Sequence, residues 1–197
     1  FMNYENTQEF AKEMDAKDPL RGFRDRFLIP EINGTEAVYF CGNSLGLQPK
    51  TVNEAIQQEL RDWAKLGVYG HLQAKNPWYS YHEMFADPLS QLVGAKPSEV
   101  VAMNGLTVNL HLMLMSFYRP EGKKHKILCE QMAFPSDQYA LESQVRYHGF
   151  DPSNAIVEVK PEPGKYTIST ADILGAIEEG KEDIALVLFG GVSYYTG

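Results

Sequence analysis

Apolar positions recur with helical spacing through much of the second half of the chain, and short aliphatic runs separate these helical stretches. Aliphatic or β-branched runs of this length predict buried strands, and apolar residues three and four positions apart predict helices. From residue 83 onwards the sequence predicts helix 83–95, strand 99–103, helix 106–118, strand 126–130, helix 136–148, strand 155–159, helix 171–180 and strand 184–189. This succession is typical of right-handed βαβ units, so an α/β fold with a mostly parallel sheet is expected.

The first part of the chain follows a different pattern. Within residues 1–30 the apolar residues predict an amphipathic helix, a break near Pro19 and a second short helical piece that ends at Pro30. A brief strand is expected at 37–40, and a loop with two glycines at 41–49. We interpret this part as an amino-terminal helical arm.

A capping-box pattern begins the next helix, because Thr51 is followed three residues later by Glu54. Apolar residues at spacings of four and three come after it, and they predict a helix over about 52–66. The stretch 67–77 is expected to be irregular. His71 lies in this stretch and is either an ordinary surface residue or a ligand contact.

The turn between the predicted strand 99–103 and the predicted helix 106–118 is the first candidate site. Gly105 permits a backbone geometry that a side chain would obstruct. The first turn of a helix has unpaired N–H groups, and Thr107 adds a hydroxyl beside them, so the turn is a candidate cradle for phosphate. The alternative is a buried βα unit in which Thr107 bonds only to its own backbone.

Two further loops follow predicted strands, at 133–137 and at Gly190–Gly191. In a doubly wound sheet the carboxyl ends of parallel strands share one edge, so these loops and the turn at 104–107 are expected to lie together. Phe134 either fills the core or stacks on a planar ligand. A phosphate cradle, an aromatic ring and a carboxylate together suit a planar, phosphorylated cofactor.

Composition narrows the classes of function. The 197 residues are 44% hydrophobic and 22% charged, as in ordinary folded proteins, and they suffice for one domain with a sizeable core. The net charge of -8 argues against nucleic acid or an anionic membrane as partner, because both are bound mainly through surplus Lys and Arg. Residues 100–118 lack charged side chains, but polar residues interrupt them, so a buried strand and helix are favoured over a membrane span.

Several other sites and locations are disfavoured. Cys41 and Cys129 lie far apart without a metal-ligand spacing and are expected to be reduced thiols. The pair His82-Glu83 has no second ligand at helical spacing, so no metal site is expected. The dinucleotide fingerprint and the P-loop are absent. The amino terminus lacks the features of a signal peptide, and a cytoplasmic location is expected.

Five motifs resemble kynureninases in their order and separation: Tyr39–Lys50 (YFCGNSLGLQPK), Tyr69–His71 (YGH), Met103–His111 (MNGLTVNLH), Phe134–Tyr139 (FPSDQY) and Tyr195–Gly197 (YTG). The resemblance implies the aspartate aminotransferase-like large domain of a fold-type-I pyridoxal-phosphate enzyme. It also implies a homodimer that hydrolyses L-kynurenine or 3-hydroxykynurenine to anthranilate or 3-hydroxyanthranilate and L-alanine, in tryptophan catabolism and NAD biosynthesis.

By the same resemblance, nine positions match ligand contacts. Leu106 and Thr107 match residues that hold the cofactor phosphate, and Phe134 matches the ring that stacks on the pyridine. The remaining matches are Pro135, Ser136 and Asp137 in the same cofactor segment, Gly190 where the family has a serine, and Ser44 and His71 on the substrate side. Pro135, Ser136 and Asp137 also suit a helix start on their own account.

No catalytic residue is matched, because the Schiff-base lysine of the family lies beyond the position of Gly197. We therefore expect residues 1–50 to form an arm and a substrate-side loop, and residues 51–197 to form the first part of an incomplete cofactor domain. This stretch alone is expected to be inactive. The alternative is a non-enzymatic module that binds a phosphorylated ligand or serves assembly.

Overall fold

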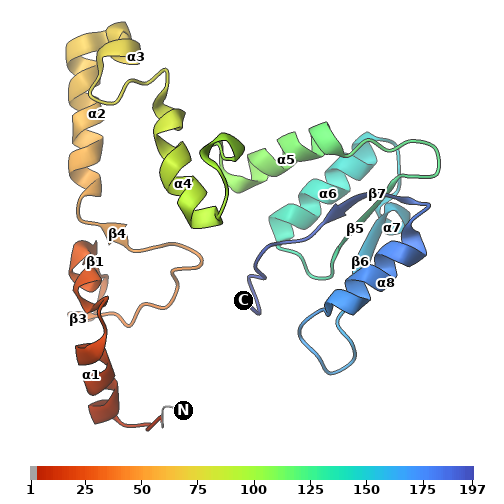
Figure 1. The fold of residues 1–197 in the computed structure, drawn as a ribbon, viewed down its shortest axis with the longest axis horizontal. Helices are drawn as coiled ribbons and strands as arrows, with labels where there is room; N and C mark the ends of the chain where they lie inside the picture. Colours follow the sequence, from red (N-terminus) through yellow and green to blue (C-terminus); the bar gives the residue numbers. More distant parts are fainter. Residues whose placement is uncertain (1–3) are drawn as a thin grey trace. The chain divides into compact units, whose positions relative to one another are not determined.

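The computed structural model describes residues 4–197 (Figure 1). The chain divides into two compact units, one ending at Val100 and the other beginning at Val101. These units are defined by the contacts within each of them, whereas the boundary predicted at residue 50 separates an arm from a cofactor domain. The boundary at residue 50 stays a prediction.

The second unit is built on a three-stranded parallel sheet in the order β6-β5-β7. Its strands are β5 (Lys126–Glu130), β6 (Ile156–Val159) and β7 (Ile184–Leu188). In the register of the sheet, Leu128 of β5 lies opposite Val157 and Val187. The predicted α/β fold with a parallel sheet is confirmed, and three of its predicted strands are present.

Strand β5 is buried on both faces. Ile127 and Cys129 belong to a core cluster with side chains of α5 and α6, among them Leu114 and Leu141. Leu128 points to the opposite face, since side chains alternate along a strand, and it is also fully buried. A parallel strand between two neighbours is expected to be covered on both sides.

Four helices complete this unit: α5 (Leu106–Phe117), α6 (Pro135–Tyr147), α7 (Pro152–Ala155) and α8 (Thr170–Gly180). Helices α5 and α6 pack along each other, as Figure 1 shows. Helix α8 begins with a capping box, in which Ser169 and Asp172 each accept a hydrogen bond from the other's backbone N–H. The predictions of α5, α6 and α8 are confirmed to within a residue or two, whereas α7 was not predicted.

The first unit contains short elements. Its helices and strands are α1 (Gln8–Lys17), η1 (Arg21–Arg26), β1 (Phe27–Leu28), β2 (Glu31–Ile32), β3 (Thr35–Glu36), β4 (Gln48–Pro49), α2 (Val52–Leu66), η2 (Gly67–Tyr69), α3 (Gly70–Gln73), η3 (Tyr81–Phe85), α4 (Ala86–Val93) and η4 (Pro97–Glu99), where η marks a 3-10 helix. Strand β1 pairs antiparallel with β4, and β2 pairs antiparallel with β3. Between residues 4 and 100, only Gly70, Ala74 and Ser90 are buried.

The predicted strands at 37–40 and 99–103 are wrong. Residues 37–40 have no regular structure, and residues 97–99 form η4, after which the chain stays unpaired up to residue 103. Val100 is extended, with φ -126° and ψ 137°, as its β-branched side chain favours. A strand also needs a run of hydrogen bonds to a neighbouring strand, and among residues 4–197 neither segment is paired in this way, although the N–H of Ala37 donates to the Pro30 carbonyl at 2.8 Å.

The helical predictions for the first unit need smaller corrections. The amino-terminal helix, its break and the second helical piece are confirmed as α1 and η1, and the helix predicted at 52–66 is confirmed as α2. The capping box at its start is wrong, because Thr51 has a helical φ of -79° and its side chain caps nothing. The stretch 67–77 is partly helical, and the helix expected at 83–95 is shorter and follows a 3-10 turn.

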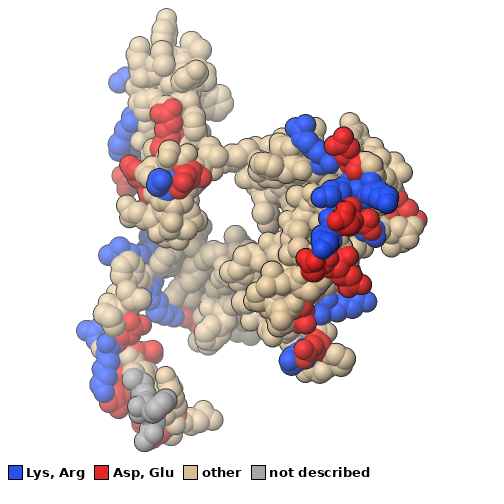
Figure 2. Space-filling view, turned by 45° about the vertical axis from the view of Figure 1, so that its right-hand side comes forward, with Lys and Arg blue, Asp and Glu red and all other residues tan. Residues whose placement is uncertain are grey.

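Charged side chains of both signs lie interspersed on the face drawn in Figure 2. Among the ion pairs of the described residues, Lys126–Asp183 joins β5 to the turn before β7, with Nζ and Oδ2 3.0 Å apart. The Lys126 ammonium holds the pKa of Asp183 below its usual value, first through the hydrogen bond and then through its charge. The backbone carbonyl of Asp183 also accepts from the N–H groups of His125 and Lys126.

The Lys126–Asp183 pair predicts a pH dependence of stability. Because the pKa of Asp183 is lowered by folding, the stabilisation is present above its usual pKa of 3.8 and is lost as the pH falls through the lower, folded-state value. Asp183→Asn should therefore lower the urea midpoint at neutral pH, and the difference from the unmodified protein should shrink below pH 3.8. Glu182→Gln is the control, since Glu182 has no ion pair among the described residues. An equal deficit at both pH values would contradict the assignment.

Candidate functional site

The carboxyl ends of β5 and β7 bring two of the predicted loops together. β5 ends at Glu130, and β7, its hydrogen-bonded neighbour, ends at Leu188. The backbone N–H of Gly190 donates to Oε1 of Glu130 at 3.4 Å. A Cβ atom on Gly190 would lie 3.1 Å from that oxygen, so glycine allows this loop to approach the Glu130 carboxylate closely.

Phe134 links the same two loops. Its ring centre lies 5.3 Å from that of Tyr194, and the two ring planes stand at 88° to each other. The exposed fraction of Phe134 is 49%, so part of the ring faces outward. This exposure favours the ligand-stacking alternative for Phe134 over the core-filling one.

A cavity of about 500 Å³ opens beside these loops. Its lining comes from residues 130–132, from the chain between β6 and the first turns of α8, and from residues 189–197. Glu130, Lys165 and three tyrosines are among the lining residues, and the ammonium of Lys165 is paired with the Glu162 carboxylate at 2.6 Å. Ionised groups combined with aromatic rings suit a ligand that is planar and charged.

Helix α6 begins at Pro135, as expected from the residues Pro135, Ser136 and Asp137, which suit a helix start. The carbonyl oxygen of Phe134 accepts hydrogen bonds from the N–H groups of Asp137 and Gln138 at 2.8 and 3.1 Å. Oγ of Ser136 donates to Oδ1 of Asp137 at 3.3 Å. The Asp137 carboxylate lies in the first helical turn, where the helix dipole favours negative charge.

The start of α5 offers unoccupied donors. Gly105 is the N-cap residue and has no side chain to cap the first turn, and both Leu106 and Thr107 are exposed. Asn109 fixes the preceding loop, since its Oδ1 accepts from the N–H of Asn104 at 3.1 Å and its Nδ2 donates to the Asn104 carbonyl at 2.9 Å. The first-turn N–H groups thus remain available to an anion.

Two expectations for this turn are corrected. Gly105 has φ -65° and ψ 159°, which a residue with a side chain also adopts, and no atom would crowd a Cβ there. The turn also does not follow a paired strand, so the sheet does not carry it to the edge where Phe134 and Gly190 meet. Its position in the unit depends on the packing of α5 against α6, which includes a 3.4 Å contact between His111 and Gln144.

The two predicted substrate-side residues lie in the first unit. Ser44 occupies an exposed turn, in which the N–H groups of Ser44 and Leu45 donate to the Cys41 carbonyl. The hydroxyl of Tyr39 donates to the Leu45 carbonyl at 2.6 Å and holds this turn. His71 lies on α3, and its ring meets the ring of Trp78 at 5.6 Å and 86°.

Sequence reasoning missed Glu130 and Tyr194 as members of the site. A signal existed for both. Glu130 is the last residue of a correctly predicted strand, and ligand sites in parallel sheets lie at that end. Tyr194 directly precedes the motif at 195–197. What the sequence did not supply was the pairing of β5 with β7 that brings the two together.

The described residues restrict other chemistry. Burial, assisted by the charges of Glu158 and Glu130, raises the pKa of the Cys129 thiol to about 12, so this thiol is no nucleophile at neutral pH. Between residues 4 and 197, no cluster of His, Cys, Asp and Glu could hold a metal ion. In the same part of the chain, no helix is long and apolar enough to span a membrane.

Comparison with known proteins confirms the resemblance. The kynureninase of Christiangramia forsetii is 55% identical over 196 residues, and that of Flavobacterium johnsoniae is 53% identical over 196 residues; each match covers 100% of this chain and 46% of the relative. The kynureninase of Koribacter versatilis is 53% identical over 195 residues. The chain therefore spans about half the length of the curated relatives it matches. No family model matches the chain.

Gly190 and Gly191 form a matched pair for testing the close approach to Glu130. Gly190→Ala places a methyl group against Oε1 of Glu130, whereas a Cβ on Gly191 meets no atom within 4 Å. We expect Gly190→Ala to be less stable than Gly191→Ala by about 0.5–1.5 kcal/mol, the usual contribution of one hydrogen bond, in urea unfolding followed by circular dichroism. In a Glu130→Ala background the two variants should be equally stable. A difference that persists there would show that Glu130 is not the cause.

Proposed function

This chain is similar to kynureninases over its whole length, and from that premise we propose that it is part of a pyridoxal-phosphate enzyme that hydrolyses L-kynurenine or 3-hydroxykynurenine. The products are anthranilate or 3-hydroxyanthranilate and L-alanine, which places the enzyme in tryptophan catabolism and NAD biosynthesis. The observation that carries the proposal is identity of 53–55% to these kynureninases over 195–196 aligned residues.

The proposed enzyme has a large domain of fold type I. The parallel sheet β6-β5-β7 with its covering helices is the first part of a fold-type-I large domain, in which the rest of the protein completes the sheet. The open edge of β7 and the unpaired segment before α5 are the places where further strands would add. Residues 1–50 supply the arm and a substrate-side loop, and residues 51–197 supply the first part of the large domain.

The described residues fit pyridoxal phosphate by their chemistry. The uncapped first turn of α5 and the Thr107 hydroxyl suit the dianionic phosphate, and the half-exposed face of Phe134 suits the pyridine ring. Ser136, Asp137 and the backbone of Gly190 are the remaining polar contacts. Bound there, the cofactor supplies the electron sink for carbon–carbon cleavage, and the chain's own residues anchor and orient it.

On the substrate side, Ser44 and His71 contact the amino-acid and aryl ends of the substrate. The complete protein is a cytoplasmic homodimer that does not bind nucleic acid, and the net charge of -8 and the interspersed charges of Figure 2 support the last point. The rival function is a non-enzymatic module for a phosphorylated ligand. It predicts cofactor binding without turnover.

The direct test is turnover by the complete protein. Purified protein loaded with pyridoxal phosphate should convert L-kynurenine to anthranilate, followed by fluorescence, with one L-alanine formed for each anthranilate. Protein stripped of the cofactor is the control. If the loaded protein releases neither product from kynurenine or from 3-hydroxykynurenine, the proposed activity is wrong and the binding module is favoured.

Thr107 provides a prediction for the phosphate contact. A hydrogen bond to a charged group contributes about 1.5–3 kcal/mol. Thr107→Val should therefore weaken cofactor affinity about ten- to hundredfold, at 1.4 kcal/mol for each factor of ten. The dissociation constant of pyridoxal phosphate, measured by absorbance titration of the stripped complete protein, is the readout.

Two variants make this test specific. Thr107→Ser keeps the hydroxyl and should restore most of the affinity. Thr170→Val makes the same substitution at the first residue of α8 and should leave the affinity unchanged. Equal affinities of the Thr107→Val variant and the unmodified protein would mean that Thr107 only begins a helix.

A further inference from the structure

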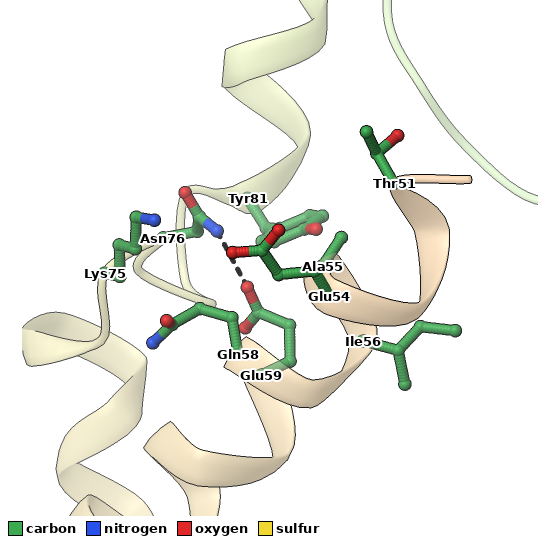
Figure 3. A pocket seen from close by; sticks show the side chains of 9 residues that line it. All are labelled: Thr51, Glu54, Ala55, Ile56, Gln58, Glu59, Lys75, Asn76 and Tyr81. Atoms are coloured by element: carbon green, nitrogen blue, oxygen red, sulfur yellow. Dashed lines mark hydrogen bonds between the residues drawn. The ribbon is translucent and has the colours of Figure 1, made fainter. Parts of the chain in front are cut away.

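A second cavity lies in the first unit, outside the residues assigned to the cofactor. Its volume is about 380 Å³, and it lies between α2 and the chain around residues 75–81 (Figure 3). Glu54 and Glu59 of α2 lie on one side of it, and Asn76 faces them from the other side. Glu59 is half-buried, whereas Glu54 is exposed.

Both carboxylate oxygens of Glu59 are engaged. Oε1 accepts from Nδ2 of Asn76 at 2.7 Å, the bond drawn in Figure 3, and Oε2 accepts from the indole Nε1 of Trp78 at 2.9 Å. Hydrogen bonds to an ionised group are roughly twice as strong as neutral ones. Glu59 is therefore a fixed anchor of this chain segment rather than a free ligand group in the cavity.

Trp78 transmits this anchoring to α3. Its ring covers Gly70 so closely that a Cβ there would lie 2.3 Å from the nearest ring atom. The same ring meets that of His71 at 5.6 Å and 86°. A backbone hydrogen bond also joins the two segments, because the N–H of Tyr79 donates to the carbonyl of His71 at 3.1 Å.

His71 needs such support. It is exposed and lies on a helix of four residues, which is too short to hold a side chain by its own stability. Among the contacts of residues 4–197, the ring of His71 packs edge to face on Trp78, and Trp78 is fixed by Glu59. Loss of the Glu59 hydrogen bond would leave the indole held by its packing on Gly70 alone, and the imidazole would lose part of its restraint.

We propose that Glu59 is a positioning residue that acts through Trp78 to fix the His71 ring for contact with the aryl end of the substrate. This inference rests on the proposed kynureninase function. Glu59 does not touch the substrate, and its effect reaches the reaction only through the orientation of His71. A group held in productive geometry contributes to turnover, and a small misplacement lowers it.

The experiment is a double-mutant cycle in the complete, cofactor-loaded protein. Glu59→Gln keeps the size of the side chain but sets an amide N–H against one of the two donors, and it should lower kcat/KM for L-kynurenine roughly three- to tenfold. Trp78→Phe removes the indole donor, keeps an aromatic ring near His71, and should have a similar effect. Glu54→Gln makes the same change on the same helix, where no hydrogen bond is lost, and should leave kcat/KM unchanged.

The decisive readout is the coupling to His71. Because Glu59 acts through His71, Glu59→Gln in a His71→Ala background should cause no further loss of kcat/KM. The single variants Glu59→Gln and His71→Ala should also shift the ratio of kcat/KM for kynurenine to kcat/KM for 3-hydroxykynurenine in the same direction. Cofactor absorbance and the thermal midpoint are measured for each variant, so that loss of cofactor or of folding is separated from misplacement.

Two outcomes would overturn the proposal. Additive losses in the double variant would make Glu59 a general stabiliser of the first unit, and an unchanged kcat/KM in Glu59→Gln would make the bond dispensable. These outcomes differ from failure of the proposed kynureninase function, because in that case the unmodified protein itself would show no turnover.

Discussion

Burial of strand β5 on both faces is the constraint on which the second unit depends. Ile127 and Cys129 are closed in by α5 and α6, and Leu128 is buried on the opposite side. Because β5 is the central strand, its burial also fixes where β6 and β7 lie. The carboxyl ends of β5 and β7 then stand side by side, and this is why Phe134 reaches Tyr194.

The first unit is held in another way. With three buried residues between positions 4 and 100, hydrophobic burial contributes little to the placement of its loops. Specific polar bonds take that role: Tyr39 holds the turn with Ser44, and Glu59 holds the segment that packs on His71. Segments with so little buried apolar surface depend on each such bond for their placement.

Within the second unit, the surroundings of Phe134 and Thr107 differ. Phe134 lies just after the carboxyl end of β5, and its ring makes an edge-to-face contact with that of Tyr194. Thr107 lies on α5, a helix whose apolar side chains are largely exposed in the second unit. Exposed apolar surface of this extent is typical of a face that contacts other protein.

The sequence by itself determined the elements whose signal is local. The apolar runs at 126–130 and 184–188 and the helical periodicity of α2, α5, α6 and α8 were sufficient, because burial and backbone propensity act on the segment itself. The motif spacing likewise identified the related family. Tertiary structure alone decided whether the residues at 99–103 and 37–40 form strands, because an extended segment becomes a strand only when it pairs with a neighbour. It also decided the long-range contacts, since no local pattern predicts the hydrogen bond of Glu59 with Trp78 or the approach of Gly190 to Glu130. Such contacts join residues far apart in the chain, and only the folded packing brings them within bonding distance.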